Sequence, residues 1–194
     1  LKKSKNEKPR MLLSHAEEIA ERVVKHLKKL EHVEHAIPLG SLRRRKSTVG
    51  DLDFAVSSTK PEEVIKHFVK FEEIRTIETQ GENMSTVLLT NDTQVDILVT
   101  PPEALGALLQ HFTGSKQHNI ALRKLALEQG KSLSQHGIKV KGKIKPIATE
   151  EKFYEELGLP WITPELREGM HELEIAKKRK LPNLIELKDI KGDL

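Results

Sequence analysis

Cysteine is absent from this chain of 194 residues, and long apolar runs are absent as well. Without cysteine there are no disulfides, no thiolate metal sites and no cysteine nucleophiles. No stretch approaches the roughly 18 to 20 apolar residues that a membrane-spanning helix needs, and no leader of charged and then apolar residues indicates secretion. We therefore expect a cytoplasmic protein that has no membrane partner.

The nine histidines do not occur at spacings that are typical of a metal site. Neither H-E-x-x-H nor H-x-H is present, although histidine is the commonest metal ligand. We expect the histidines to be structural. Carboxylates are then the candidate metal ligands.

Charge is plentiful but unevenly distributed. The chain is 37% hydrophobic and 32% charged, with a net charge of +4, which is typical of a soluble protein with one large or two small domains. Residues 111–149 contain eight cations and one anion, whereas residues 151–194 have a net charge of −2. A local excess of +7 is typical of a surface that binds nucleic acid. For residues 139–145 alone, a solvated face is the alternative.

Three aspartates lie in or beside apolar segments that are predicted to be strands. Asp51 and Asp53 are two residues apart, and Asp96 lies inside the apolar run of residues 95–99. Alternate residues of a strand point to the same face, so Asp51 and Asp53 can act together. Carboxylates are the ligands that Mg²⁺ prefers, and three of them predict a two-metal phosphoryl-transfer site. The alternative for an Asp-x-Asp at the start of a strand is a solvated edge or turn.

A short basic segment separates Gly40 and Ser41 from the first two aspartates. It contains four cations at residues 43–46 and ends at Gly50. A Gly-Ser turn offers backbone N–H groups and a hydroxyl, arginine offers two parallel donors to phosphate, and Gly50 allows a ligand to approach closely. The pattern predicts a triphosphate site beside metal ligands. A nuclear-localisation signal or a nonspecific basic patch would explain the cations but not the flanking acids.

Hydrophobic periodicity and turn signals predict an α+β fold over residues 1–100. Ser14 and Glu17 have the spacing of a capping box, and apolar residues at helical spacing continue to Leu30. A second helix is expected from Pro61 to residue 70. Strands are expected over residues 33–39, 51–56, 74–78, 84–90 and 94–100, with a hairpin turn at residues 91–92. This order predicts a mixed, largely antiparallel sheet backed by helices.

A second unit is expected after the prolines at positions 101 and 102. Helices are predicted over residues 103–110 and 116–129, followed by a basic hairpin around residues 141–143. We assign residues 101–165 to this small helix and hairpin subdomain and residues 166–194 to a C-terminal linker.

Four short motifs are more specific together than any one of them alone. They are Gly40-Ser41-Leu42-Arg43-Arg44, Gly50-Asp51-Leu52-Asp53, Val95-Asp96 and Phe112-Thr113-Gly114-Ser115. In order and spacing, this set resembles the family X DNA polymerases, most closely the bacterial and archaeal branch. The resemblance covers roughly residues 9–165. The first two motifs also occur across the wider nucleotidyltransferase superfamily.

The resemblance implies a nucleotidyltransferase palm, then the nucleotide-side subdomain called thumb or fingers, and a repair-type DNA polymerase activity. Asp51, Asp53 and Asp96 would bind two Mg²⁺ ions, with Mn²⁺ as an alternative. Asp51 and Asp53 would serve both ions, and Asp96 would serve only the catalytic one. The implied partners are a dNTP and primer-template DNA, preferably gapped. We expect the protein to be a monomer.

The resemblance also assigns side chains to the nucleotide and to DNA. The implied nucleotide-binding residues are Gly40, Ser41, Arg44, Gly50, Arg10, Phe112, Gly114 and Asn119. Arg123 would reach the template strand. The charge pattern adds Lys139, Lys141 and Lys143 as DNA contacts. For Arg10, the alternative is a surface arginine in a charged tail.

The sequence departs from the animal members of the family at three positions. His111, Lys116 and Gln94 stand where those members commonly have Tyr, Asp and Arg. The differences concern sugar discrimination and alignment of the primer, not metal binding. The end of the chain resembles the point where bacterial members continue into a polymerase-and-histidinol-phosphatase domain, and the family's helix-hairpin-helix domain is expected to be missing before the palm.

Two rival functions follow from the same residues. One is another nucleotidyltransferase that acts on RNA ends, a small molecule or a protein, for which the motif at residues 112–115 would be unnecessary. The other is a non-catalytic nucleic-acid clamp. Clustered carboxylates repel DNA and one another unless metal binds them, so intact Asp51, Asp53 and Asp96 argue against a clamp.

Overall fold

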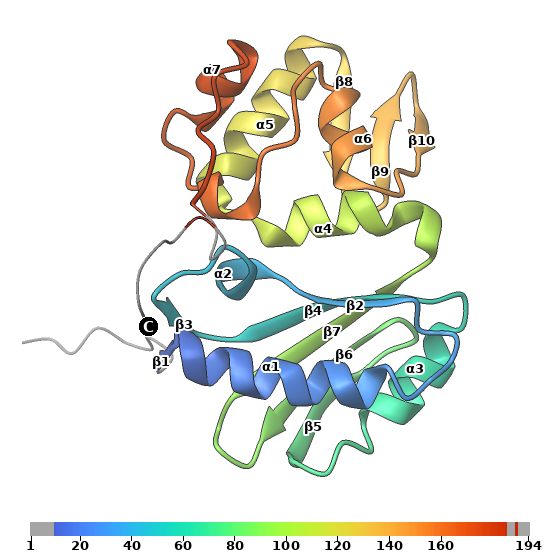
Figure 1. Ribbon diagram of the computed structural model, residues 1–194. Coiled ribbons are helices and arrows are strands. Elements are labelled where there is room, and N and C mark those ends of the chain that lie inside the picture. Colours follow the sequence, from blue (N-terminus) through green and yellow to red (C-terminus); the bar gives the residue numbers. More distant parts are fainter. Residues whose placement is uncertain (1–9, 186–188, 190–194) are drawn as a thin grey trace, which may run out of the picture.

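The computed structural model describes residues 10–185 and residue 189 (Figure 1). The expected end of the linker, residues 190–194, lies outside the described residues, as do residues 1–9 and 186–188. The described part contains a five-stranded sheet with helices on both faces and a second group of helices with a three-stranded sheet. The predicted α+β class, with a mixed sheet backed by helices, is confirmed.

The central sheet has the strand order β2-β4-β7-β6-β5. Its strands are β2 (His35–Pro38), β4 (Leu52–Ser57), β5 (Ile74–Gln80), β6 (Met84–Leu89) and β7 (Gln94–Thr100). β4 and β7 are parallel, and the other neighbouring pairs are antiparallel. β6 and β7 alternate buried with more exposed residues, which is the period of a half-buried strand. The antiparallel pairing of β6 and β7 confirms the predicted hairpin.

Helices cover both faces of the central sheet, and further helices form the second unit (Figure 1). The helices are α1 (Leu13–Leu27), α2 (Gly40–Arg43), α3 (Pro61–Phe68), α4 (Leu105–Thr113), α5 (Lys116–Glu128), α6 (Glu150–Glu155) and α7 (Glu172–Lys177). α1 and α3 share a core with Phe54 and Ile97. α4 packs on the other face, against Ala55 and Leu98. Because alternate strand residues point to opposite faces, Asp53 lies on the α4 side with Ala55.

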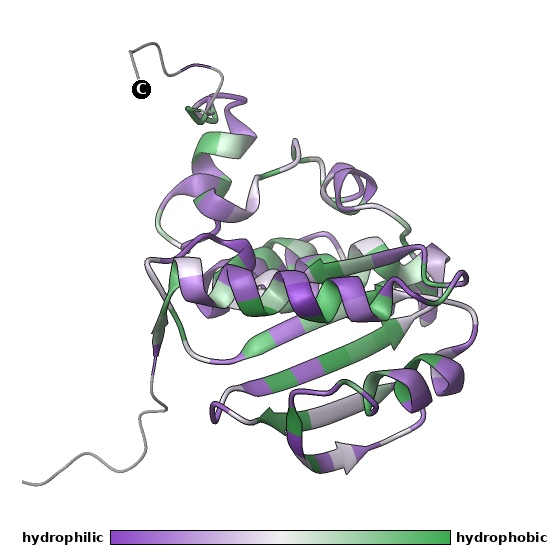
Figure 2. Cartoon of the chain, turned by 60° about the horizontal axis from the view of Figure 1, so that its bottom comes forward, coloured by the Kyte–Doolittle hydropathy of each residue, from purple (hydrophilic) through white to green (hydrophobic). Residues whose placement is uncertain are grey.

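The start of α1 differs from the prediction. The helix begins at Leu13, after the N-cap residue Leu12, and has no side-chain cap, so the predicted capping box at Ser14 is wrong. β1 (Met11–Leu12) pairs with β3 (Thr48–Val49), and the N–H of Leu13 donates to the carbonyl of Ser47 at 3.1 Å. The backbone carbonyl of Ser47 therefore accepts a hydrogen bond from an N–H of the first turn, which a capping side chain would otherwise satisfy. The apolar stripe itself is present, with hydrophobic and hydrophilic residues on different sides of α1 (Figure 2).

The second unit surrounds its own hydrophobic core. Leu122 of α5 packs there with Phe153 and Tyr154 of α6. The three-stranded sheet consists of β8 (Lys131–Ser134), β9 (Gly137–Val140) and β10 (Lys143–Lys145). β9 and β10 confirm the predicted basic hairpin, whereas β8 was not predicted. Short 3-10 turns at Pro102–Ala104 and Pro164–Leu166 complete the described fold. In the described ranges, no helix is long and apolar enough to cross a membrane.

Candidate functional site

Asp53 and Asp96 lie side by side on neighbouring strands. β4 and β7 are parallel, and their register pairs the Cα of Asp53 with the Cα of Asp96. Both residues are partly exposed and lie on the face of the sheet that α4 covers. Asp51 comes directly before β4 and is also partly exposed. Sheet register thus brings two of the three predicted metal ligands together.

Hydrogen bonds orient the carboxylate of Asp96. Thr86 Oγ1 on β6 donates to Oδ1 at 2.5 Å, and Gln94 Nε2 donates to Oδ2 at 2.7 Å. Thr86 is the register partner of Asp96 across β6 and β7, and Gln94 lies two residues earlier on the same strand face. Each carboxylate oxygen has a second lone pair, so both can accept a further ligand.

The first residue of α2 approaches the carboxylate of Asp53. Gly40 has a φ of 57°, and a Cβ at this position would lie 3.2 Å from Asp53 Oδ2. The N–H of Leu39 donates to the backbone carbonyl of Asp53 at 2.8 Å. Both the backbone conformation and the close approach favour glycine. Ser41 follows and is partly exposed, and the expected Gly-Ser turn is the start of a single helical turn.

The three aspartates offer oxygen ligands only, which suits Mg²⁺ or Mn²⁺. Within residues 10–185 and at residue 189, no three Asp, Glu or His side chains stand close enough together to hold one ion. Asp53 and Asp96 are paired by the sheet, and among the described residues Asp51 does not form a group of three ligands with them. The donor chemistry fits the implied ions, and the three-ligand site stays a prediction.

Arg43 connects α2 to α4 and α6 through buried contacts. Its Nη1 donates to Thr113 Oγ1 and its Nη2 donates to Glu150 Oε2, each at 2.6 Å. Glu150 also accepts a hydrogen bond from Arg167 Nη1 at 2.5 Å. Burial opposes ionisation of Glu150, but Arg167 and Arg43 outweigh that effect and lower its pKa. Arg43 therefore acts as a structural cation.

Arg44, predicted to contact the triphosphate, is mostly buried at the end of α4. Its Nη1 donates to the carbonyl of Thr113 at 2.5 Å, and its Nε donates to Glu168 Oε1 at 3.1 Å. Gly114 ends α4 with a φ of 72°, and a Cβ there would lie 3.1 Å from Arg44 Nη1. Phe112 is partly buried in the core below α4. The structure thus brings Arg44 and Gly114 together, with Phe112 nearby in the chain.

Asn119 on α5 is directed toward the end of α4. Its Nδ2 donates to the carbonyl of His111 at 2.7 Å, and its Oδ1 accepts from Nε2 of the buried Gln110 at 2.8 Å. Arg123 lies one helical turn later and is exposed. Burial, followed by the charge of Arg123, lowers the pKa of His111. This part of the site therefore presents an imidazole whose neutral form is favoured, near the exposed cation Arg123.

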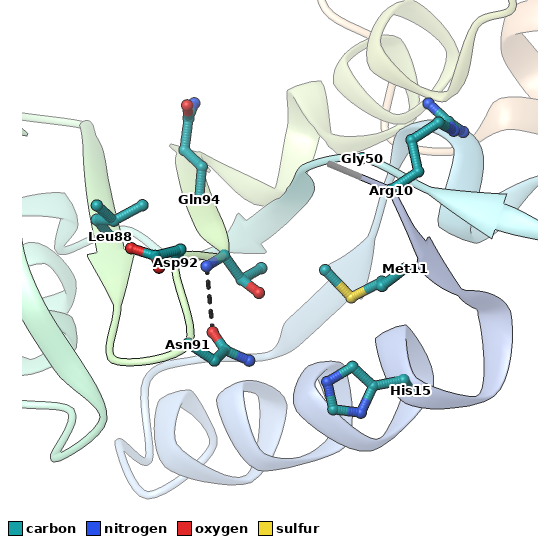
Figure 3. A pocket seen from close by; sticks show the side chains of 9 residues that line it. Arg10, Met11, His15, Gly50, Leu88, Asn91, Asp92 and Gln94 are labelled. Atoms are coloured by element: carbon teal, nitrogen blue, oxygen red, sulfur yellow. Dashed lines mark hydrogen bonds between the residues drawn. The ribbon is translucent and has the colours of Figure 1, made fainter. Parts of the chain in front are cut away.

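Arg10 lies beside Gly50 at the edge of the site (Figure 3). Its Nε donates to Thr48 Oγ1 at 3.0 Å and its Nη2 donates to the carbonyl of Thr48 at 2.5 Å. A cavity of about 310 Å³ opens between the start of α1 and the β6–β7 turn, and Arg10, Gly50 and Gln94 are among its lining residues. The structure thus brings the predicted residues Arg10 and Gly50 together.

The basic hairpin is separate from the aspartates. Lys139, Lys141 and Lys143 are all exposed on the β9–β10 hairpin. Lys139 and Lys143 lie on strands of the three-stranded sheet and Lys141 lies in the turn between them, whereas Asp53 and Asp96 belong to the central sheet. The hairpin and the aspartates therefore belong to different sheets.

Some polar residues near the site were missed by sequence reasoning. Glu168 pairs with Arg44 across 124 positions of the chain. Glu172 accepts from His118 Nδ1 at 2.7 Å, and His118 Nε2 lies 2.8 Å from the hydroxyl of Tyr154. Burial lowers the pKa of His118, although Glu172 opposes this shift. No local pattern signals such distant pairs, so the sequence offered no means of finding them.

Comparisons with known proteins identify similar chains. The sequence pattern described as "DNA polymerase beta thumb" matches residues 108–168. The "DNA polymerase/3'-5' exonuclease PolX" of Bacillus subtilis is 36% identical over 189 residues, which are 95% of this chain and 33% of that protein. The chain therefore spans about a third of the length of this relative.

Shorter matches extend to eukaryotic proteins. "DNA polymerase lambda" of Rattus norvegicus is 36% identical over 87 residues, covering 39% of this chain and 15% of that protein. "DNA polymerase IV" of Saccharomyces cerevisiae is 34% identical over 74 residues, covering 38% of this chain and 13% of that protein. All three relatives carry the name of a DNA polymerase.

Proposed function

The chain belongs to the family X DNA polymerases, and we propose that it performs nucleotidyl transfer as a repair-type, DNA-directed DNA polymerase. In this reaction the 3′-hydroxyl of a primer attacks the α-phosphate of a dNTP, and pyrophosphate leaves. The observation that carries the proposal is the pair of in-register aspartates, Asp53 and Asp96, beside the close backbone approach of Gly40. Named DNA polymerases among the relatives support it.

The aspartates are assigned different roles. Asp51 and Asp53 would hold both of two Mg²⁺ ions, and Asp96 would hold only the catalytic one. When bound, these ions lower the pKa of the primer hydroxyl and neutralise charge on the departing pyrophosphate. The chain itself positions the carboxylates. Sheet register sets Asp53 beside Asp96. Hydrogen bonds from Thr86 and Gln94 orient the Asp96 carboxylate.

The nucleotide is proposed to lie between α2 and the end of α4. The triphosphate contacts would be Ser41, Arg44, Arg10 and the backbone of Gly50; the sugar contacts would be Phe112 and Gly114; the base contact would be Asn119. The proximity of Arg44 to Gly114 supports this placement, because it joins a proposed phosphate contact to a proposed sugar contact.

DNA is proposed to be the second partner, in gapped primer-template form. Arg123 would contact the template, and Lys139, Lys141 and Lys143 would contact backbone phosphates, which release counterions on binding. In this proposal, residues 1–100 form the palm, residues 101–165 the nucleotide-side subdomain and residues 166–194 a linker. We expect the protein to act as a monomer in the cytoplasm.

Asparagine substitutions separate the roles of the aspartates. Asp96→Asn should abolish primer extension but keep most binding of a Mg²⁺–dNTP complex, because Asp51 and Asp53 still serve the nucleotide-bound ion. Asp53→Asn should lose both. Calorimetry with a non-hydrolysable dNTP and single-turnover extension of a gapped duplex measure the two properties.

The matched control is Glu62→Gln. Glu62 is an exposed carboxylate of α3 that pairs with Lys66, and α3 packs on the face of the central sheet opposite α4, so its loss should leave both dNTP binding and primer extension unchanged. Extension by Asp96→Asn at the parental rate would contradict the assignment. Binding of dNTP and DNA by the parental chain without any extension would favour the non-catalytic clamp instead.

A further inference from the structure

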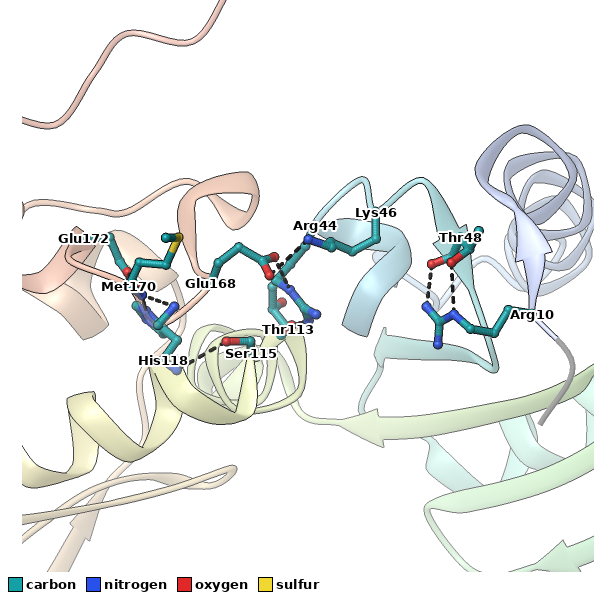
Figure 4. A network of polar contacts seen from close by, with 11 residues as sticks. Arg10, Arg44, Lys46, Thr48, Thr113, Ser115, His118, Glu168, Met170 and Glu172 are labelled. Carbon is teal, nitrogen blue, oxygen red and sulfur yellow. Dashed lines mark hydrogen bonds and ion pairs between the residues drawn. The ribbon is translucent and has the colours of Figure 1, made fainter. Parts of the chain in front are cut away.

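The carboxylate of Glu168 lies between two cations of the α2 region (Figure 4). Glu168 Oε1 accepts from Arg44 Nε and Glu168 Oε2 accepts from Lys46 Nζ, each at 3.1 Å. The Arg44 side chain is only 13% exposed and that of Glu168 is 31% exposed. Both oxygens of one anion are therefore directed at two cations, which is also the arrangement that a phosphate group would adopt.

The backbone on either side of Glu168 is anchored. Before it, Arg167 is fully buried, and its Nε donates to the carbonyl of Ile162 at 2.8 Å. After it, the N–H groups of Gly169 and Met170 donate to Glu172 at 2.7 and 2.8 Å. This segment, residues 167–172, therefore holds the Glu168 side chain at a defined place rather than leaving it as one of many surface rotamers.

Arg44 is oriented independently of Glu168. Its Nη1 donates to the carbonyl of Thr113. Gly114 has no Cβ, which leaves room for the guanidinium at the end of α4. Removing the charge of Glu168 should therefore leave Arg44 in place, with one negative charge fewer beside two cations.

We propose that Arg44 and Lys46 form a polyphosphate site and that Glu168 occupies it as an internal phosphate substitute, which the triphosphate of an incoming nucleotide displaces. This inference rests on the proposed function, in which Arg44 contacts the triphosphate, and adds Lys46 and Glu168 to that site. The exchange replaces one set of charge-assisted hydrogen bonds by another, so the mostly buried Arg44 is never left without an anion. The cost of displacing Glu168 reduces the affinity for every anion that uses the site.

The test is titration of inorganic tripolyphosphate into the 194-residue chain, without metal, primer or nucleotide, at one low salt concentration. Glu168→Gln should bind tripolyphosphate roughly three- to ten-fold more tightly than the parent, since it removes a partly exposed competing charge and keeps the side-chain shape. The control Glu174→Gln removes the same charge from an exposed position of α7, near His171 rather than Arg44, and should leave the affinity unchanged.

A second variant shows whether the gain arises at this site. Adding Lys46→Met to Glu168→Gln should cancel most of the increase, and circular dichroism should confirm that each variant is folded. Equal or weaker binding by Glu168→Gln, or no binding by any variant, would overturn the proposal. Binding of tripolyphosphate without metal does not require the aspartates. The titration therefore tests only the role of Glu168, whereas primer extension tests the polymerase assignment.

Discussion

The side-chain amide of Asn119 is held at both ends. Gln110 donates to its Oδ1, and its own Nδ2 donates to the carbonyl of His111. Because an amide NH₂ has two hydrogens, one remains available to a ligand. Asn119 is thus fixed as a hydrogen-bond donor, which suits the acceptor atoms that base pairs present in the minor groove. The buried Gln110 therefore determines that Asn119 presents an N–H donor to a ligand.

Replacing Gln110 by leucine should weaken nucleotide selection without removing catalysis. The change leaves Asn119 Oδ1 without its donor and lets the amide rotate, so we expect KM for dNTP to rise about ten-fold, the equivalent of one lost hydrogen bond to an oriented group, with kcat changed much less. Steady-state extension measures both. Gln117→Leu is the control, because Gln117 is exposed on the same helix; an unchanged KM for Gln110→Leu would contradict the positioning role.

Single residues differ in how well the sequence predicted them. Asp53 and Asp96 could be anticipated because strand alternation and apolar flanks determine which way they point, and the positive φ of Gly40 agrees with its motif. The pairing of Arg44 with Glu168 could not, because it depends on a segment 124 positions away. Long-range ion pairs leave no periodic signal in a sequence.

At the scale of elements, α1 and α3 are joined by two stacked histidines. His26 Nε2 lies 2.9 Å from the carbonyl of His67, His67 Nε2 lies 2.8 Å from the carbonyl of His26, and the rings stack at 4.2 Å. Burial lowers the pKa of His26 and charge on His67 lowers it further, while the hydrogen bond to the His67 carbonyl opposes both. The neutral form of His26 is therefore favoured in the folded state.

Stability should consequently fall under mildly acidic conditions. An unfolded histidine binds a proton near pH 6.5, but folded His26 binds one only at lower pH, so the unfolded state holds more protons between these two values and becomes favoured as the pH falls through that window. Urea denaturation at pH 7.5, 6.5 and 5.5 should give decreasing free energies of unfolding. His26→Phe should lose stability at pH 7.5 yet show a smaller decrease toward pH 5.5. A parental stability that rises on acidification would contradict this account.

Helices and strands were predicted correctly where local sequence patterns are strong, and they were missed where pairing with distant residues determines the structure. The strands of the central sheet, α3 and the basic hairpin follow from apolar alternation and turn residues. The N-terminus of α1 was misassigned because the β1–β3 pairing, not a side chain, satisfies it. β8 is short and only partly buried, with no alternating apolar pattern, and its partner β9 stabilises it.

At the scale of the whole molecule, one buried network connects the central sheet region to the second unit. Glu150 accepts from Arg43 on α2 and from the fully buried Arg167. Glu150→Ala leaves two arginines without their anion and should lower the free energy of unfolding by about 3 to 5 kcal/mol. Glu151→Ala alters the exposed neighbouring residue and should have little effect. Chemical denaturation measures the free energy of unfolding of both variants. Equal losses of stability would show that Glu150 does not stabilise the contact between the central sheet region and the second unit.

The central claim is that Asp53 and Asp96 form a nucleotidyl-transfer site, and the most direct measurement is single-turnover incorporation of one complementary nucleotide into a gapped duplex with Mg²⁺. We expect the 194-residue chain to extend the primer by one nucleotide, and Asp53→Asn to lower the rate by roughly a thousand-fold or more, since metal ligation supplies several kcal/mol of transition-state stabilisation. Glu62→Gln should react at the parental rate. Incorporation by Asp53→Asn at the parental rate would contradict the account.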